Sequence, residues 1–221
     1  EPLRLRDAGG AAIRLRPDQH GDFAQSLAPG TWRLEDPLSD TQWSGFLLGY
    51  APVRLARPLA AIAPRTTAWT LITVTFDDLQ RSYIEKIAAG YAGLDWDYLL
   101  AVDNQFYKGP GYINGLMSGA NVAYNSSGHP VTVRALQPGG RFDFIGGYFS
   151  AAWHNAEGET LAVRAWRDDQ LVAEEQLRLS HLAPVYLHAD YRDITRLELE
   201  TTHYWQFVVD DLSFRLPQTG E

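Results

Sequence analysis

The stretch Thr160-Leu-Ala-Val-Arg-Ala-Trp-Arg167, the pair Asp168-Asp169 and the following residues to Leu179 decide the fold class. After the Asp pair, the apolar side chains recur in steps of two, at Leu171, Ala173, Leu177 and Leu179. A spacing of two is that of a strand with one buried face, because successive side chains of a strand point to opposite faces. The Asp pair supplies a tight turn. The stretch therefore predicts an antiparallel β-hairpin.

The same pattern recurs along most of the chain. In Trp69-Thr-Leu-Ile-Thr-Val-Thr-Phe76, the residues Ile72, Val74 and Phe76 share one face. Further strands are expected at 131–135, 141–144, 148–153, 160–167, 171–179, 184–188, 195–201 and 205–214. Only residues 81–89 have helical character, for two turns at most, and 90–125 is expected to be a long Gly- and Asn-rich loop. Many short strands with frequent turns predict an all-β, antiparallel sandwich.

The N-terminal third has a different pattern of residues. Short strands and turns fill residues 1–50, and prolines then stand at positions 52, 58 and 64. Prolines at this spacing are incompatible with a central strand or a long helix. We therefore expect an N-terminal β-rich appendage ending in a proline-containing strap at 1–66, the sandwich at 67–216 and a short tail at 217–221.

Composition limits the possible partners. The formal net charge is −8 and the chain has no basic stripe, which argues against a nucleic-acid partner. No run approaches about 18 apolar residues, so no helical membrane span is predicted. Cysteine is absent, which excludes thiolate catalysis and disulfides and fits a secreted or periplasmic protein, although many cytosolic proteins also lack cysteine. The sequence does not indicate an oligomeric state.

Five short blocks carry a resemblance to a known family. They are Thr75-Phe-Asp-Asp-Leu79, Gly90-Tyr-Ala-Gly-Leu-Asp-Trp96, Gly111-Tyr-Ile-Asn-Gly115, Ser118-Gly-Ala-Asn-Val-Ala-Tyr-Asn125 and Val209-Asp-Asp-Leu-Ser-Phe214. From about residue 70 to 214 the chain resembles the jelly-roll β-sandwich domain of many secreted bacterial proteins, some with a PEP-CTERM sorting signal, and of secreted fungal proteins. The resemblance implies a jelly-roll fold and a secreted or periplasmic location. It implies no particular activity, and its likeness to carbohydrate-binding modules is architectural.

Four aspartates form the first candidate site. Asp77 and Asp78 end the first strand of the sandwich, and Asp210 and Asp211 lie in its last strand. The first and last strands of many jelly rolls are neighbours, which would bring these carboxylates together, and such a cluster is costly without a cation. A structural Ca²⁺ ion, which prefers oxygen ligands, is one interpretation. The other is that these aspartates accept backbone N–H bonds at strand ends. A catalytic carboxylate pair is a third, less favoured interpretation.

Aromatic and amide side chains in the predicted 90–125 loop form the second candidate site. Sugars stack their C–H faces on aromatic rings and bond amides through their hydroxyls, so this composition suits a glycan or a cell-surface polymer. Alternatively, the rings anchor the loop, most of all Trp96 and Tyr112, which belong to the recurring blocks. The predicted ligand-binding residues are Trp96, Tyr107, Tyr112, Asn114 and Asn121.

No motif of a known reaction class is present. The chain has no Gly-x-Ser-x-Gly elbow and no His-x-x-x-His or His-x-His pair. Asp95 and Asp97 are too close in sequence to act on both faces of a sugar. We therefore assign no catalytic residue and expect a glycan-binding module with a structural calcium ion. The alternatives are a structural or adhesive surface protein and, third, a glycan-cleaving enzyme.

Overall fold

The computed structural model describes residues 4–7, 9, 11–14, 30–35, 42–47, 53–55, 69–79, 83–104 and 107–218. The contacts divide the chain into two compact units, Glu1–Ala51 and Pro52–Glu221. No helix among these residues is long and apolar enough to cross a membrane.

The first unit is a small antiparallel sheet with the strand order β2-β1-β3-β4. Its strands are β1 (Arg4–Asp7), β2 (Ala12–Arg14), β3 (Gly30–Glu35) and β4 (Gln42–Leu47). The β-rich character predicted for the N-terminal segment is confirmed for these residues.

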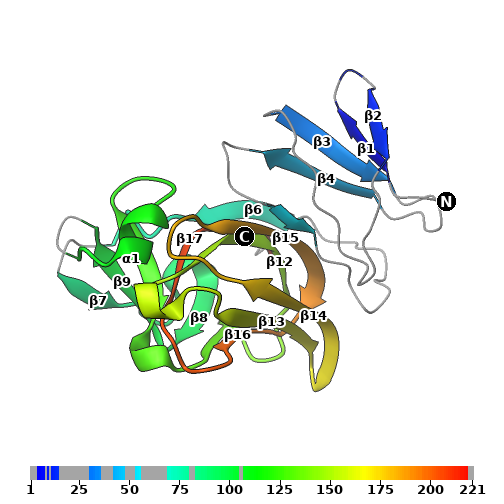
Figure 1. Cartoon of the computed structure of the whole chain (residues 1–221). Coiled ribbons are helices and arrows are strands. Elements are labelled where there is room, and N and C mark those ends of the chain that lie inside the picture. The colour runs from blue at the N-terminus through cyan, green and yellow to red at the C-terminus, as the bar shows by residue number, and fades with distance from the viewer. Residues whose placement is uncertain are drawn as a thin grey trace. The chain divides into compact units, whose positions relative to one another are not determined.

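The larger sheet of the second unit has the order β5-β15-β12-β17-β10-β9-β7, and β6 pairs with β17 beside this path (Figure 1). Every pairing in it is antiparallel except that of β5 with β15. The strands are β5 (Val53–Leu55), β6 (Trp69–Val74), β7 (Ile84–Lys86), β9 (Leu99–Asp103), β10 (Asn121–Asn125), β12 (Phe142–Ala151), β15 (Val185–Ile194) and β17 (Phe207–Pro217). Because β5 lies within the predicted strap, that segment contributes an edge strand, and the contacts divide the chain before it.

The second sheet of this unit has the order β14-β13-β16-β11-β8. Its strands are β8 (Leu94–Asp97), β11 (Val131–Ala135), β13 (Thr160–Arg167), β14 (Gln170–Arg178) and β16 (Arg196–Thr201). The β13–β14 hairpin turns at Asp168, whose φ is 54°. The chain crosses repeatedly between the two sheets, as from β8 to β9 and from β16 to β17. The predicted jelly-roll β-sandwich is therefore confirmed.

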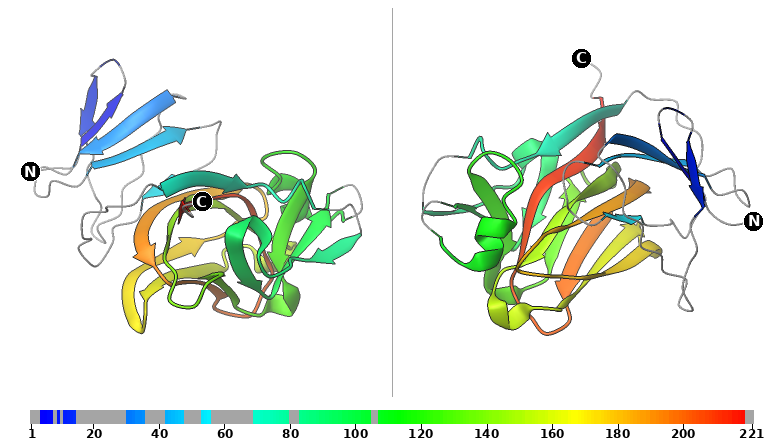
Figure 2. Two further views of the ribbon diagram at one scale, coloured as in Figure 1. Left: turned by 180° about the vertical axis from the view of Figure 1, so that it is seen from behind. Right: turned by 45° about the horizontal axis from the view of Figure 1, so that its top comes forward.

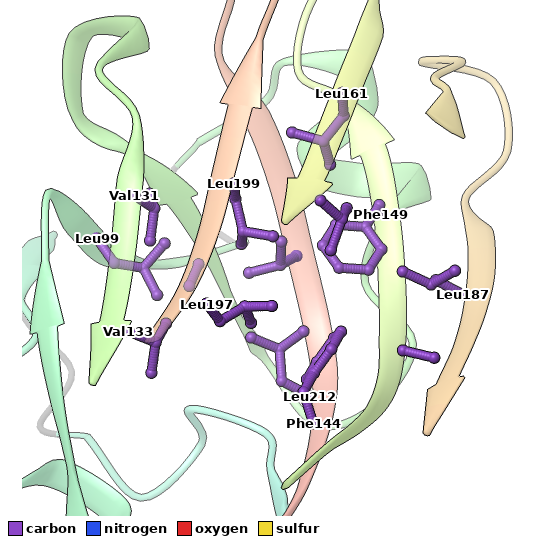
Figure 3. Packing of buried hydrophobic residues seen from close by; sticks show 14 of the residues in the cluster. Leu99, Val131, Val133, Phe144, Phe149, Leu161, Leu187, Leu197, Leu199 and Leu212 are labelled. Carbon is purple, nitrogen blue, oxygen red and sulfur yellow. The ribbon is translucent and has the colours of Figure 1, made fainter. Parts of the chain in front are cut away.

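A core of apolar side chains fills the space between the two sheets (Figure 3). Phe144, Phe149 and Leu212 of the larger sheet face Val133 and Leu199 of the smaller one, and all five are fully buried. A second apolar cluster covers the opposite face of the larger sheet and includes Val102, Val122 and Val208. Strands β9 and β10 are therefore apolar on both faces.

Two predicted segments differ from the structure. The expected long loop at 90–125 contains three strands, β8, β9 and β10. Strands β9 and β10 have no alternating pattern because they are buried on both faces. The helical character expected at 81–89 is wrong for the described residues of that range. There, Ile84–Lys86 form β7, which pairs with β9. One-turn elements complete the unit: η1 (Tyr91–Gly93), α1 (Pro110–Asn114), η2 (Ser126–Gly128) and η3 (His154–Ala156).

The first and last strands of the sandwich are neighbours, as the jelly-roll prediction required. The first part of β17 pairs with β10 through Val208 and Val209. The later part pairs with β6 and begins with Leu212, which lies opposite Val74. The partner changes at Asp210 and Asp211, where Asp211 takes a positive φ of 50°. The segment that contains α1 lies at one end of the larger sheet, beside β9 and β7 (Figure 2).

Candidate functional site

The predicted calcium ligands lie where β6 and β10 meet β17, and each carboxylate accepts hydrogen bonds. Asp77 Oδ1 accepts the backbone N–H groups of Ala120 and Asn121 at 2.7 and 3.0 Å. Asp210 Oδ2 accepts those of Met117 and Ser118 at 2.7 and 3.1 Å. These bonds fasten the 117–121 segment to the first and last strands of the sandwich.

The other two aspartates accept hydrogen bonds from side-chain hydroxyl groups. Asp211 Oδ1 accepts a bond from the Ser118 hydroxyl at 2.6 Å, and Asp78 Oδ1 accepts one from the Tyr91 hydroxyl at 2.5 Å. Within the described part of the chain, no three or more His, Asp or Glu side chains are grouped so that they could hold a metal ion. The hydrogen bonds match the second interpretation of these aspartates, and the calcium site stays a prediction.

Asp210 is the electrostatically unusual member of this group. Its side chain is fully buried, and burial raises the pKa of its carboxyl to about 7. The N–H bonds from Met117 and Ser118 favour the charged form but oppose only part of this effect. A carboxyl group in the middle of a sheet therefore titrates near neutral pH.

Three of the predicted ligand-binding residues are buried. Trp96 is 4% exposed, packs edge-on against Phe214 and donates its indole N–H to Tyr91 O at 2.8 Å. Tyr112 is fully buried, and Asn121 donates its amide N–H to Phe76 O at 2.8 Å. Their side chains anchor the surrounding segments, and no ring face of Trp96 or Tyr112 is open to a ligand in this structure.

The other two predicted residues are more accessible. Asn114 is exposed and donates its amide N–H to His181 O at 2.8 Å. Tyr107 is half-buried at the centre of an aromatic group that we call the Tyr107 cluster. Its five members are Tyr83, Tyr107, Tyr112, Tyr124 and Trp153.

The Tyr107 ring contacts every other ring of this cluster. Its centroid lies 4.5 Å from Tyr112 and 5.7 Å from Trp153, both nearly edge-on, and it lies almost parallel to Tyr124 at 6.4 Å. Tyr83, 6.3 Å away, is 56% exposed. The cluster therefore combines a buried base with a partly exposed rim.

Close backbone packing positions the cluster on the sheet. The Gly111 N–H donates to Ala152 O at 3.1 Å, and a Cβ atom on Gly111 would lie 1.7 Å from Ala151 O, so only glycine allows α1 to approach β12 this closely. Gln206 Oε1 accepts the indole N–H of Trp153 at 2.8 Å and the hydroxyl of Tyr112 at 3.3 Å. The Gln206 amide is thereby oriented with its NH₂ group able to donate elsewhere.

Sequence reasoning missed a histidine pair near this cluster. His154 directly follows Trp153, and its Nδ1 lies 2.9 Å from Nε2 of His181. On the other side of the His181 ring, Nδ1 lies 2.6 Å from Glu157 Oε2. The two histidines are 27 positions apart, a distance at which no sequence motif could have linked them.

No family model and no curated protein matches this chain. Solved structures that resemble it include a family 29 carbohydrate-binding module mutant in complex with cellulohexaose, with 12% identity, a TM-score of 0.39 and coverage of 69% of this chain and 94% of that one. The binding and catalytic modules of the endo-1,4-β-D-xylanase 10B of Clostridium thermocellum with xylohexaose give 15% identity and a TM-score of 0.33, covering 65% of this chain and 28% of that one. A family 16 carbohydrate-binding module has 14% sequence identity and a TM-score of 0.31, with coverage of 54% of this chain and 89% of that one.

Proposed function

We propose that the sandwich is a binding module that holds a glycan on the rim of the Tyr107 cluster. The observation that carries this proposal is the position of Tyr107: its ring is held by four other rings and yet stays partly exposed. A ring fixed in this way loses little conformational entropy when a ligand binds, and an aromatic face suits the C–H surface of a sugar.

Polar groups beside the rings supply the complementary chemistry. The Gln206 carbonyl oxygen is occupied by Trp153 and Tyr112, so its NH₂ group is the part that can donate to a sugar hydroxyl. The exposed Lys108 adjoins Tyr107 in sequence. A few oriented polar groups around an apolar surface are the usual composition of a small-molecule site.

The proposed partner is a glycan or a cell-surface polymer, and the proposed location is secreted or periplasmic. A chain without cysteine is suited to an oxidising compartment, because it has no thiol to oxidise there. The Ca²⁺ ion expected near Asp77 and Asp210 is part of the same proposal as a structural ion.

A glycan array followed by calorimetry on the hits tests the proposal, with Tyr107→Ala as the disruptive variant and Tyr107→Phe as its matched control. Loss of the ring should weaken binding about tenfold, since a stacking contact contributes on the order of 1 kcal/mol or more. The Phe variant keeps the ring and should bind within about threefold of the wild type.

Two outcomes would contradict this assignment. One is a glycan whose affinity is the same for the wild type and Tyr107→Ala when both are folded by circular dichroism. The other is release of reducing ends from the bound polysaccharide, which would favour the glycan-cleaving alternative.

A further inference from the structure

Glu157, His181 and His154 form a chain of hydrogen bonds that the proposed glycan site does not use, and we call these three residues the histidine relay. His154 begins η3 and is exposed, whereas His181 follows β14 and is only 7% exposed. The rings of the two histidines are nearly perpendicular, with centroids 4.4 Å apart.

The carboxylate fixes the tautomer of the inner histidine. Because an ionised carboxylate only accepts hydrogen bonds, His181 Nδ1 carries the proton that it shares with Glu157 Oε2. The same Oε2 also accepts the backbone N–H of His181 at 2.9 Å and the Ser180 hydroxyl at 3.0 Å. In neutral His181, the lone pair of Nε2 therefore points toward Nδ1 of His154.

The bond between His181 and Glu157 is of the kind found in metal-binding histidines. A ligating histidine almost always donates its other ring N–H to a carboxylate, a carbonyl or water, which orients the ring and makes the ligating nitrogen more basic. Two imidazole nitrogens that bind the same ion each lie about 2.0–2.1 Å from it. When the nitrogen–ion–nitrogen angle is between the square-planar and the tetrahedral value, the two nitrogens lie about 2.9–3.4 Å apart. The observed separation of 2.9 Å is at the lower end of this range.

Hydrogen bonds to backbone carbonyl groups hold the two loops of the relay in place. Asn114 donates to His181 O at 2.8 Å, and the Ala151 N–H donates to Ser180 O at 3.1 Å. The Glu157 N–H donates to His154 O at 3.1 Å, closing η3. In this bond His154 Nδ1 donates its proton to His181 Nε2. To bind an ion shared with His181, the exposed His154 ring would turn and its proton would move from Nδ1 to Nε2, which leaves a lone pair on Nδ1.

We propose that His154 Nδ1 and His181 Nε2 bind a divalent transition-metal ion, with Glu157 as the outer partner of His181. Imidazole nitrogen suits Cu²⁺, Ni²⁺ and Zn²⁺, and Cu²⁺ is the ion that such ligands bind most tightly. Ca²⁺ prefers oxygen ligands, so this site is distinct from the one predicted at the aspartates. Glu157 contacts Nδ1 of His181, on the side of the ring away from the proposed ion, and no three His, Asp or Glu side chains among the described residues are grouped to hold a metal, so we expect water to complete the coordination.

Titration of the full chain with Cu²⁺ alone, by calorimetry and electron paramagnetic resonance, tests this proposal without any glycan. The wild type should bind one ion with nitrogen hyperfine structure from two imidazoles. His154→Ala, which removes an exposed side chain, should lower the affinity at least tenfold and leave one imidazole in the spectrum. Glu157→Gln should lower the affinity about ten- to a hundredfold, which is typical for loss of an outer partner.

His203→Ala is the matched control. His203 Nδ1 lies 3.1 Å from Glu159 Oε2, so it is also a histidine beside a carboxylate, but no second imidazole is recorded next to it in the described chain. This variant should bind Cu²⁺ as the wild type does. Unchanged Cu²⁺ affinity in folded His154→Ala, or an equal loss in His203→Ala, would overturn the proposal. Neither result would bear on glycan binding at Tyr107.

Discussion

The buried carboxyl of Asp210 makes a quantitative prediction about stability and pH. Its folded-state pKa is raised to about 7, whereas an aspartate in an unfolded chain titrates near 3.9. Between these values the folded protein binds a proton that the unfolded chain has released, so the free energy of unfolding should rise as the pH falls from about 7 to about 4. A shift of about three pKa units corresponds to about 4 kcal/mol as an upper bound.

Comparison with Asp210→Asn isolates this contribution. Urea unfolding followed by tryptophan fluorescence at pH 5, 6, 7 and 8 gives the free energy of unfolding of both proteins. Burial lowers the pKa of His188, so that residue costs stability as the pH falls through about 6.5, opposite to Asp210. This cost is present in both proteins and cancels in their difference. Lowering the pH from 8 to 5 crosses only about two of the three pH units that separate the two pKa values, so the wild type should gain about 2.6 kcal/mol relative to Asp210→Asn over this range.

Parallel pH profiles of the two proteins would refute the reasoning. They would mean that the hydrogen bonds from Met117 and Ser118, or a bound cation, keep the carboxyl ionised at neutral pH. Repeating the series with EDTA separates these explanations, since only the effect of a cation disappears when the ion is removed.

The remaining predictions concern the calcium ion and the aromatic anchors. If Ca²⁺ binds at Asp77 and Asp210, EDTA should lower the melting temperature and added Ca²⁺ should restore it. At a hundredfold excess of Ca²⁺ over Kd, the free energy of unfolding should rise by about 2.7 kcal/mol. An unchanged melting curve, together with no metal by elemental analysis, would exclude the ion. Trp96→Ala should cost about 3–5 kcal/mol of unfolding free energy in urea, because it empties a core position. Tyr107→Ala should cost less, about 1–2 kcal/mol, since part of its ring is already exposed. Equal losses for these two variants would show that Tyr107 is also a core residue.

Sequence alone predicted the β13–β14 hairpin and the dense strands after Trp69, because a sheet with one apolar face has an alternating pattern. It failed for β9 and β10, whose residues Val102 and Val122 are buried on the face away from the main core. With apolar residues on both faces, no alternation remains, and the Gly- and Asn-rich segments on either side suggested a loop.

The candidate sites were predicted less completely than the fold. The neighbouring positions of Asp77 and Asp210 followed from the expected pairing of the first and last strands. Whether a ring such as Trp96 faces the core or the solvent depends on register, which a short strand of four residues does not reveal. His154 and His181 meet only because β12 and β14 end at the same edge of the sandwich, where Ala151 bonds Ser180.

The central position of β17 has a consequence for the order of folding. This strand, the last in the described chain, lies between β12 on one side and β10 and β6 on the other, and it pairs Pro217 with Trp69, 148 positions earlier. Until β17 leaves the ribosome, β6, β10 and β12 lack their shared partner and expose unpaired edges, which favour aggregation. The larger sheet should therefore assemble late and slowly, as expected for strand pairings of such sequence separation. Strands β6, β10 and β12 therefore need protection from unwanted pairing for as long as β17 is not available to them.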